Sequence, residues 1–430
     1  MFDLEKIVIN GPSKLCGEVE ISGGKNAIVA ILPATIMVEG PCRIENVPNI
    51  SDVTHILDIL QYMGANIKII DKKTLEIDCT AVRNVAVPYE YARRLRASYY
   101  FMGALLARFQ SARVSMPGGC SIGLRPIDQH IKGFEALGVD VNVRHGDVVC
   151  QSSGLTNSHI YFDVVSVGAT INVMLAATKA PGLTILENVA KEPHIVDVAN
   201  FLNSMGANIS GAGTDIIKIR GVDKLCGGSY AVIPDQIEAG TFMVAAAATG
   251  GDVLVKNIIP KHMECITAKL AEMKVKIIEF DDSIRVIGGE VNRANVKTLP
   301  YPGFPTDMHP QIAVLLTQAQ GTSIITESVW ESRFKYAEEL KKMGANIQID
   351  GKIAIIEGKT TLTGAQIHSC DLRAGAAMII AGLIATGTTY INDIEHIERG
   401  YENIVDKFKA LGADIELVEF KDDSTILKAN

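Results

Sequence analysis

The chain has 430 residues, of which 47% are hydrophobic and 21% are charged, and its formal net charge at pH 7 is −8. This length exceeds what one hydrophobic core usually supports, so we expect two domains. The acidic balance argues against a nucleic-acid-binding protein, because such proteins usually carry an excess of Lys and Arg. It does not exclude a local cluster of cations that binds a small anion.

The cysteines and the N-terminal segment indicate where the protein works. The 8 Cys are scattered through apolar segments and form no C-x-x-C pair, which excludes a zinc ribbon and a thioredoxin motif. Dispersed, reduced thiols are typical of the cytoplasm. We find neither a signal peptide nor a run of about 18 apolar residues that would span a membrane. We therefore expect a cytoplasmic protein, and because its His residues show no ligand spacing, we expect no metal and no cofactor.

A short pattern recurs six times along the chain and indicates a repeated structural unit. In each copy a helix ends, usually in Met-Gly-Ala or a similar phrase, and an apolar strand follows; the equivalent positions are 64, 138, 206, 274, 344 and 412, and all but 274 are Gly. Gly suits a helix end because it adopts the left-handed conformation without strain. Position 274 is Lys, so we expect a different helix end there.

Upstream of each copy lies a helix of small apolar residues, expected at residues 27–38, 101–109, 169–180, 241–249, 312–320 and 374–386. A helix that is apolar nearly all round is usually buried. Each unit of about 70 residues therefore contains one buried and one amphipathic helix together with several strands. Six such units predict two pseudo-symmetric domains of three units each.

The starts of the buried helices carry polar residues. In chain order they are Gly24-Lys25-Asn26, Arg93-Arg94-Leu95-Arg96, Ser166-Val167-Gly168, Asp235-Gln236-Ile237-Glu238, Thr306-Asp307-Met308 and Asp371-Leu372-Arg373. Free N–H groups and the positive end of the dipole make a helix N-terminus a ready anion site. Asp235, Asp307 and Asp371 are equally explained as helix caps. Lys25 is not, because a cation opposes the dipole there, so it suggests a bound anion.

The second unit contains extra residues, which form the Gly-rich segment 117–126 around Cys120. An insertion confined to one repeat usually serves function. A free thiol keeps its proton at neutral pH and can deliver it, and nearby cations make it more reactive. A Gly-rich loop also suits a lid that closes over a substrate. A chance Cys in a flexible loop is the alternative.

Six segments of the chain, taken together, resemble one enzyme family. They are residues 21–27, 117–128, 302–307, 331–334, 371–373 and 396–401. In this order, along essentially the whole chain, they are similar to the UDP-N-acetylglucosamine 1-carboxyvinyltransferases, a branch of the enolpyruvyl transferases. The resemblance implies an α/β fold, a two-domain inside-out α/β barrel of six pseudo-repeats with buried helices. It also implies that residues 1–23 and 233–430 form the catalytic domain, and that residues 24–232 form a second domain that carries the Cys120 loop.

The resemblance further implies a transferase reaction. The 3-hydroxyl of UDP-N-acetylglucosamine attacks C2 of phosphoenolpyruvate while C3 is protonated, and the tetrahedral intermediate then loses phosphate and a C3 proton. This addition–elimination is the first committed step of peptidoglycan precursor synthesis. It needs an acid, a base, and cations for a phosphate and a carboxylate.

The same resemblance assigns roles to particular residues. Cys120 corresponds to the proton donor and to the target of the epoxide inhibitor fosfomycin, and Asp307 is the candidate base. Lys25, Arg399 and Asp371 complete the catalytic set, and the division of acid and base roles among Asp307, Asp371 and Lys25 stays open. The implied phosphoenolpyruvate contacts are Lys25, Asn26, Arg125, Arg333 and Arg399. The implied UDP-N-acetylglucosamine contacts are Arg96, Arg125, Pro126, Ile127, Asp128, Gln129, Ser166, Val167, Gly168, Asp307 and Val329.

Three other functions compete with this one. The shikimate-phosphate enolpyruvyl transferases share the fold and the donor, but they usually show Ser-Lys-Ser where this chain has Gly-Lys-Asn, and they lack the Cys loop. A ring-shaped nucleic-acid clamp also has six pseudo-repeats, but its pore helices would need Lys and Arg, whereas residues 101–106 and 243–248 are apolar. A paralogue that binds the nucleotide sugar without turnover is not favoured, because every matched polar position carries a chemically competent residue.

Overall fold

The computed structural model describes residues 4–93, 95–116 and 127–420, with the backbone alone for Leu4, Arg96 and Phe420. The described strands form six separate sheets, of which five have four strands and one has three. In each four-stranded sheet, one inner strand pairs parallel with an edge strand and antiparallel with the strand on its other side, as β3 does with β13 and β5. The same small sheet is therefore repeated along the chain.

The strands are short and fall into two groups. Those between residues 24 and 232 are β3 (Pro41–Glu45), β4 (Asn66–Asp71), β5 (Thr74–Asp78), β6 (Ser111–Ser115), β7 (Asp140–Arg144), β8 (Asp147–Gln151), β9 (His159–Tyr161), β10 (Leu183–Glu187), β11 (Asn208–Ser210), β12 (Ile216–Arg220) and β13 (Ser229–Ala231). The others are β1 (Leu4–Gly11), β2 (Cys16–Glu20), β14 (Asp252–Lys256), β15 (Lys276–Glu279), β16 (Ser283–Ile287), β17 (Val296–Lys297), β18 (Gly321–Thr326), β19 (Asn346–Asp350), β20 (Ile353–Gly358), β21 (Gln366–His368), β22 (Gly387–Asn392) and β23 (Ile415–Phe420).

The longer helices alternate between two kinds. The apolar, buried ones are α1 (Lys25–Ala34), α4 (Tyr100–Phe109), α6 (Val167–Ala177), α8 (Gln236–Ala248), α10 (His309–Thr317) and α12 (Leu372–Ile384). The amphipathic ones are α2 (Ser51–Met63), α5 (Asp128–Ala136), α7 (Pro193–Ser204), α9 (Pro260–Glu272), α11 (Tyr336–Lys342) and α14 (Ile404–Ala410). Short helices are η1 (Thr35–Met37), α3 (Tyr89–Ala92), η2 (Arg96–Tyr99), η3 (Thr306–Met308) and α13 (Glu395–Glu398).

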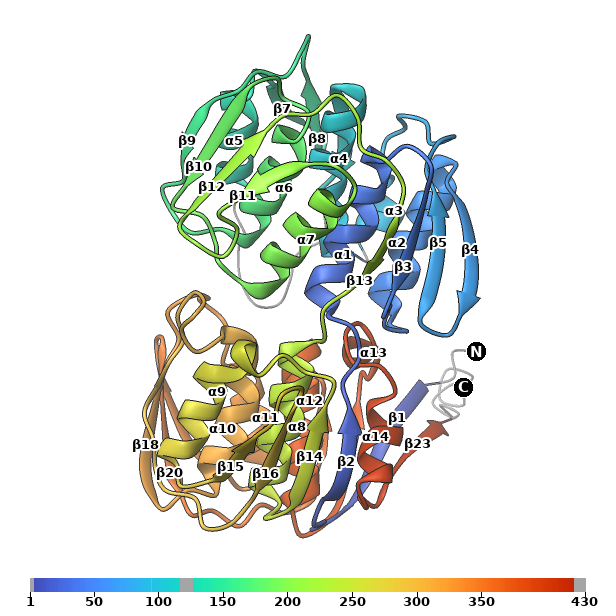
Figure 1. Ribbon diagram of the computed structural model, residues 1–430. Helices are drawn as coiled ribbons and strands as arrows, with labels where there is room; N and C mark the ends of the chain where they lie inside the picture. Colours follow the sequence, from blue (N-terminus) through green and yellow to red (C-terminus); the bar gives the residue numbers. More distant parts are fainter. Residues whose placement is uncertain (1–3, 94, 117–126, 421–430) are drawn as a thin grey trace, which may run out of the picture.

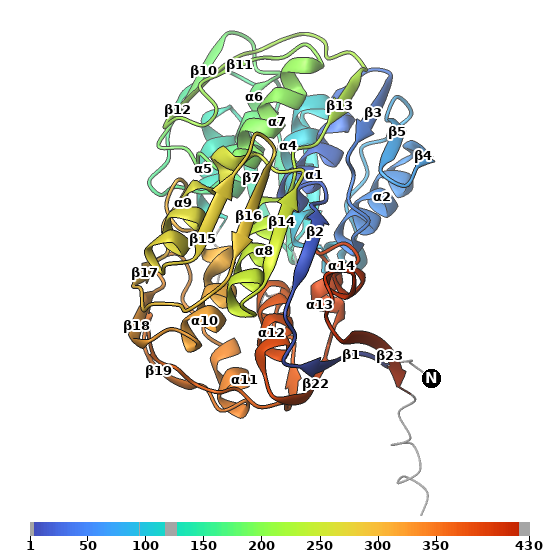
Figure 2. The same ribbon diagram turned by 60° about the horizontal axis from the view of Figure 1, so that its bottom comes forward.

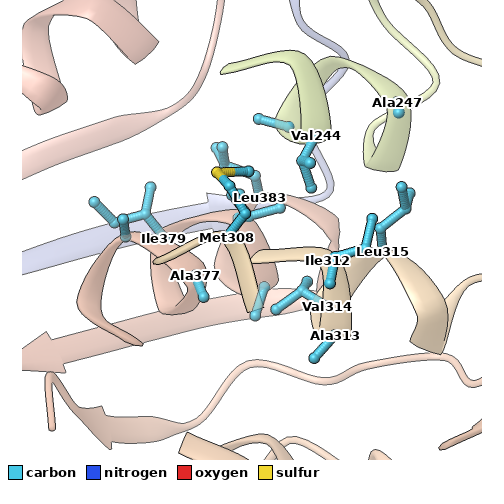
Figure 3. Close-up of a cluster of buried hydrophobic side chains, with 14 of the residues drawn as sticks. Val244, Ala247, Met308, Ile312, Ala313, Val314, Leu315, Ala377, Ile379 and Leu383 are labelled. Carbon is cyan, nitrogen blue, oxygen red and sulfur yellow. The ribbon is translucent and has the colours of Figure 1, made fainter. Parts of the chain in front are cut away.

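Two hydrophobic cores divide the molecule into lobes. One core is built from residues between 27 and 232, and the other from residues 7–21 together with residues 237–415. We call residues 24–232 the central lobe and residues 4–23 with 233–420 the terminal lobe, and Figure 1 shows them one above the other. In the terminal lobe α8, α10 and α12 contact one another, and Figure 3 shows Val244, Ile312 and Leu383 of these helices in one cluster. The predicted α/β fold of six repeats around buried helices is confirmed.

The chain crosses between the lobes twice, and the two crossing segments are hydrogen-bonded to each other. The Gly24 amide donates to the Ile233 carbonyl oxygen at 2.7 Å, and the Asp235 amide donates to the Ser22 carbonyl oxygen at 2.9 Å. Gly23 lets the residues after β3 pack against the first crossing, since a Cβ atom there would lie 1.8 Å from the Asn46 carbonyl oxygen. Figure 2 shows β2, which leads into the first crossing, beside β14 in the sheet that covers α8. Helices α1 and α8 therefore begin side by side where the lobes meet.

Both ends of the described chain lie in one sheet. Strand β1 pairs antiparallel with β22 on one side and with β23 on the other, with Leu4 opposite Phe420, so β1 and β23 lie side by side (Figure 1). None of the helices in the described ranges has the length and apolar content needed to cross a membrane.

The expectation of a different helix end at Lys274 is wrong. Lys274 has a φ of 69°, in the same left-handed region as Gly344, whose φ is 94°. The next residue, Val275, donates its amide to the Leu270 carbonyl oxygen at 3.0 Å, and the equivalent bond after Gly344 has the same length. The repeat therefore imposes the left-handed conformation on Lys274. For an L-residue with a Cβ atom this conformation is less favourable by roughly 1–2 kcal/mol of conformational free energy.

We expect replacement of Gly344 by Ala to lower the free energy of unfolding by about 1 kcal/mol, because Ala disfavours the left-handed conformation. Packing does not contribute, since the nearest atom to an added Cβ would be 3.8 Å away. The matched control is Lys274→Ala, which keeps a Cβ atom at the equivalent position and should leave the urea midpoint nearly unchanged. Equal shifts for the two variants would contradict this explanation.

Candidate active site

Lys25 and Arg399 share one buried carboxylate at the junction of the lobes. Lys25 is the first residue of α1, Arg399 follows α13, and Asp52 lies in the first turn of α2. Lys25 Nζ lies 2.9 Å from Asp52 Oδ2, and Arg399 Nε lies 2.9 Å from Oδ1. Burial alone would raise the pKa of Asp52, but the two cations hold it below its ordinary value. Two cations around one carboxylate leave an excess positive charge for a further anion.

A second charged cluster lies beside the first, at the crossing. Asp235 caps α8 by accepting the Glu238 amide at 2.9 Å, and its other oxygen accepts the Lys25 amide at 2.8 Å. Glu238 is buried, accepts the Ser22 amide at 2.9 Å, and forms an ion pair with Lys407. Asp235 therefore ties the starts of α1 and α8 together and fixes the backbone beneath Lys25.

Asp307 is held between two buried arginines of the terminal lobe. Arg333 Nη2 lies 3.2 Å from Asp307 Oδ1, and Arg373 Nε lies 3.1 Å from Oδ2. The side chains of Arg333 and Arg373 are 1% and 3% exposed, whereas that of Asp307 is 29% exposed. The two buried arginines therefore fix the orientation of the Asp307 carboxylate, and its exposed part can contact a bound molecule.

Three acids could be either helix caps or site residues on the sequence alone, and the structure shows that two of them are caps. Asp235 and Asp371 are the caps of α8 and α12, and each accepts two amides of its helix. Asp307 lies inside η3, whose cap residue is Pro305. Its two carboxylate oxygens contact the side chains of Arg333 and Arg373, so Asp307 is held by more than its own helix and fits a chemical role.

Glu327 organises the loop that carries Val329. This buried carboxylate accepts the Thr298 hydroxyl and the Thr306 hydroxyl, both at 2.8 Å. It also accepts the Val329 amide at 2.7 Å and the Trp330 amide at 3.0 Å. Because Thr306 precedes Asp307, Glu327 fixes the position of Val329 relative to that acid.

His194, at the start of α7 in the central lobe, connects the two clusters electrostatically. Desolvation lowers the pKa of its imidazole to about 4, the Asp307 and Asp235 carboxylates oppose this shift, and Lys25 adds to it. All three groups are therefore near enough to act on one ring. The His194 imidazole is therefore influenced by charges from both lobes.

The residues expected to hold a nucleotide sugar gather at two adjoining helix starts. Gln129 at the start of α5 bonds to Asp163, whose amide donates to Gln129 Oε1 at 2.9 Å. Ser166 caps α6 by accepting the Ala169 amide, and a Cβ atom on Gly168 would lie 3.0 Å from His130 Nε2. The structure thus brings together the predicted residues Ile127, Asp128, Gln129, Ser166, Val167 and Gly168.

Some of the predicted residues are not described. Cys120, Arg125 and Pro126 lie outside the described residues, as does the side chain of Arg96, whose backbone opens η2. Asn26 is the second residue of α1 and is half-buried. Within the described ranges, no group of three or more His, Cys, Asp or Glu side chains gathers in a way that could hold a metal ion.

The sequence interpretation missed Asp52, His194 and Glu327. An acid near the start of an amphipathic helix is normally exposed, so local sequence does not predict the burial of Asp52. Nothing local predicts its partner Arg399 either, which lies 347 positions away. Glu327 and His194 likewise gain their roles from residues that are distant in sequence.

A hollow of about 830 Å³ lies elsewhere, at the opposite ends of the central-lobe helices, and is lined by Arg108, Lys179 and Lys224 among others. Its cations are already bound. Arg108 donates to three carbonyl oxygens, Lys179 to that of Asp223, and Lys224 pairs with Glu39. The clusters around Lys25 and Asp307 are therefore the better candidate site.

Comparison with known proteins points in one direction. A family model described as EPSP synthase (3-phosphoshikimate 1-carboxyvinyltransferase) matches residues 9–408. The chain is 61% identical over 414 residues to the UDP-N-acetylglucosamine 1-carboxyvinyltransferase of Clostridium botulinum, covering 96% of this chain and 99% of the relative. It is 58% identical to UDP-N-acetylglucosamine 1-carboxyvinyltransferase 3 of Caldanaerobacter subterraneus subsp. tengcongensis, with the same coverage.

Two solved structures share the fold. The enolpyruvyl transferase NikO from Streptomyces tendae matches with a TM-score of 0.87 at 24% identity, covering 98% of this chain and all of the other. An EPSP synthase from Acinetobacter baumannii matches with a TM-score of 0.76 at 19% identity, covering 96% of this chain and all of the other. At these identities the likeness concerns the fold alone.

The contact of His130 with Gly168 and Asn172 gives a pH prediction. Burial lowers the pKa of the His130 imidazole from 6.5 to about 4. A depressed pKa stabilises the folded protein above pH 6.5, and that stabilisation is lost as pH falls toward 4. We expect the free energy of unfolding to fall between these pH values by about 3 kcal/mol more in the wild type than in His130→Gln. Denaturant titrations at several pH values measure the difference, and parallel pH profiles would contradict it.

Proposed function

The chain belongs to the family of UDP-N-acetylglucosamine 1-carboxyvinyltransferases, and we propose that it transfers the enolpyruvyl group of phosphoenolpyruvate to the 3-hydroxyl of UDP-N-acetylglucosamine. Phosphate leaves, and the product enters peptidoglycan precursor synthesis. Relatives named for this reaction are 50–61% identical over 96% of the chain. The structural observation that supports it best is a partly exposed carboxylate, Asp307, whose two oxygens are held by the buried side chains of Arg333 and Arg373.

The charges of the site suit the donor. Phosphoenolpyruvate carries a phosphate and a carboxylate, and binding both requires cations placed before the substrate arrives. Lys25 and Arg399 lie together and retain excess positive charge. The predicted contact Arg125 would add to them, whereas the predicted contact Arg333 is buried and pairs with Asp307.

Asp307 has the position that a general base needs. Its two oxygens are oriented by Arg333 and Arg373, and its side chain is partly exposed. In the proposed reaction Asp307 accepts the proton of the sugar 3-hydroxyl while the oxygen attacks C2 of the donor. Asp371 contributes through the backbone of α12, since its carboxylate accepts the Arg373 amide.

The proton for C3 comes, in this proposal, from the thiol of Cys120, which is also the expected site of alkylation by fosfomycin. Ile127 and Asp128, which directly follow the segment containing Cys120, lead into α5 beside the start of α6.

We also propose that the lobes act as two domains, with residues 1–23 and 233–430 in one and residues 24–232 in the other. The scattered free thiols of the described ranges support a cytoplasmic location.

The test of this function is the release of phosphate from phosphoenolpyruvate with UDP-N-acetylglucosamine or shikimate 3-phosphate offered separately. We expect release only with the nucleotide sugar, and its loss after pretreatment with fosfomycin. Release with shikimate 3-phosphate would assign the chain to the other branch of the fold. Release that resists fosfomycin would remove Cys120 from the mechanism.

A second test addresses Asp307. We expect Asp307→Asn to lower kcat by about a hundred-fold or more, because loss of a general base typically has that effect. The matched control is Asp281→Asn, which changes an exposed Asp of the same lobe and should keep the wild-type rate. A wild-type kcat in a folded Asp307→Asn protein would refute the proposed role.

A further inference from the structure

We propose that Asp52 is a positioning residue for the donor: its carboxylate holds Lys25 and Arg399 together across the two lobes, so that the pair receives the anionic groups of phosphoenolpyruvate. This inference rests on the proposed function and deepens it. Asp52 is not among the residues to which the family resemblance assigns a role.

The first observation is the geometry of the shared carboxylate. Lys25 Nζ contacts Oδ2 at 2.9 Å, Arg399 Nε contacts Oδ1 at 2.9 Å, and Arg399 Nη2 lies 3.4 Å from Oδ2. Among the described residues, Asp52 is the one carboxylate within ion-pair distance of either cation. Both predicted donor contacts therefore depend on a single anchor.

The second observation is burial. The Asp52 side chain is 1% exposed, whereas those of Lys25 and Arg399 are 12% and 32% exposed. An isolated buried carboxylate is strongly disfavoured, and two close cations compensate for its desolvation. The anchor therefore faces the interior and the cations face outward, which is the order required if they are to meet a ligand.

The third observation is that this anchor joins the lobes. Lys25 and Asp52 belong to the central lobe, and Arg399 belongs to the terminal lobe. A second hydrogen bond also joins the two lobes at this point, since the Asn49 amide donates to Glu402 Oε1 at 3.0 Å. Residues 399–402 thus lie on the start of α2, and the distance between the two cations is set by this docking.

Gly400 shows how closely the lobes meet at this point. A Cβ atom there would lie 2.6 Å from Cδ of Lys25 and 2.8 Å from Cδ2 of Leu372. The absence of a side chain lets the segment after Arg399 rest against the stem of Lys25. The Lys25 ammonium is consequently confined between this segment and Asp52.

The experiment compares Asp52→Asn with the wild type in steady-state kinetics. The amide keeps the shape but removes the charge, so Lys25 and Arg399 repel each other and Arg399 loses its hold on the central lobe. We expect KM for phosphoenolpyruvate to rise about ten-fold or more, while kcat and KM for UDP-N-acetylglucosamine change less than about three-fold, the pattern of lost donor binding. Asp58→Asn, an exposed Asp of the same helix, should leave all three constants unchanged.

Other outcomes overturn the proposal. An unchanged KM for phosphoenolpyruvate would show that the cations need no anchor, and equal losses in both KM values and kcat would show a merely structural role. Gly400→Ala provides a second variant that keeps every charge but displaces Lys25, and it should raise KM for the donor selectively; if Asp52→Asn does not fold, this variant decides. Calorimetric titration of the wild type and of the variant with phosphoenolpyruvate measures donor affinity without turnover, and therefore tests the role of Asp52 by itself. If the wild type releases no phosphate with UDP-N-acetylglucosamine, the proposed function is overturned independently of this result.

Discussion

The two crossings between the lobes are the constraint on which the rest of the structure depends. The segments around Gly23 and Pro234 form a bridge, and amides on each side donate to carbonyl oxygens of the other. This arrangement forces α1 and α8 to begin at one place, and it brings Lys25 and the buried Asp235 together at the junction of the lobes. Asp235 then bonds to the backbone of Lys25, so the register of the crossing also sets the position of the first cation of the site.

Charge compensation explains why so many ionic side chains tolerate burial at this junction. Asp52, Glu238, Arg333 and Arg373 are all almost fully buried, and each lies within ion-pair distance of an opposite charge. A buried ion without a partner would cost several kcal/mol. The partners usually come from different elements, and for Asp52 also from different lobes. The polar network therefore depends on the fold being complete, whereas the apolar cores lie within each lobe.

The local features of this fold could be predicted from the sequence, and the distant pairings could not. Buried helices can be predicted because helices such as α8 are apolar on nearly every side, and helix ends can be predicted because Gly recurs at one position in five of the six repeats. Asp371 was visible as a possible cap because capping involves amides two and three residues away. The link from Arg399 to Asp52 has no such signal, since it exists only after two lobes have docked. Lys274 shows the reverse case, in which the fold overrides a local preference.

The division of the cores along the chain has a consequence for synthesis. The central core uses residues between 27 and 232 only, so it can be completed while the ribosome is still making the rest. The terminal core cannot, because β2 pairs with β14 and β1 pairs with β22 and β23. The first strand to emerge, β1, is therefore among the last to find its partners, and its open edges must be kept from pairing with other nascent chains until β22 and β23 have been made.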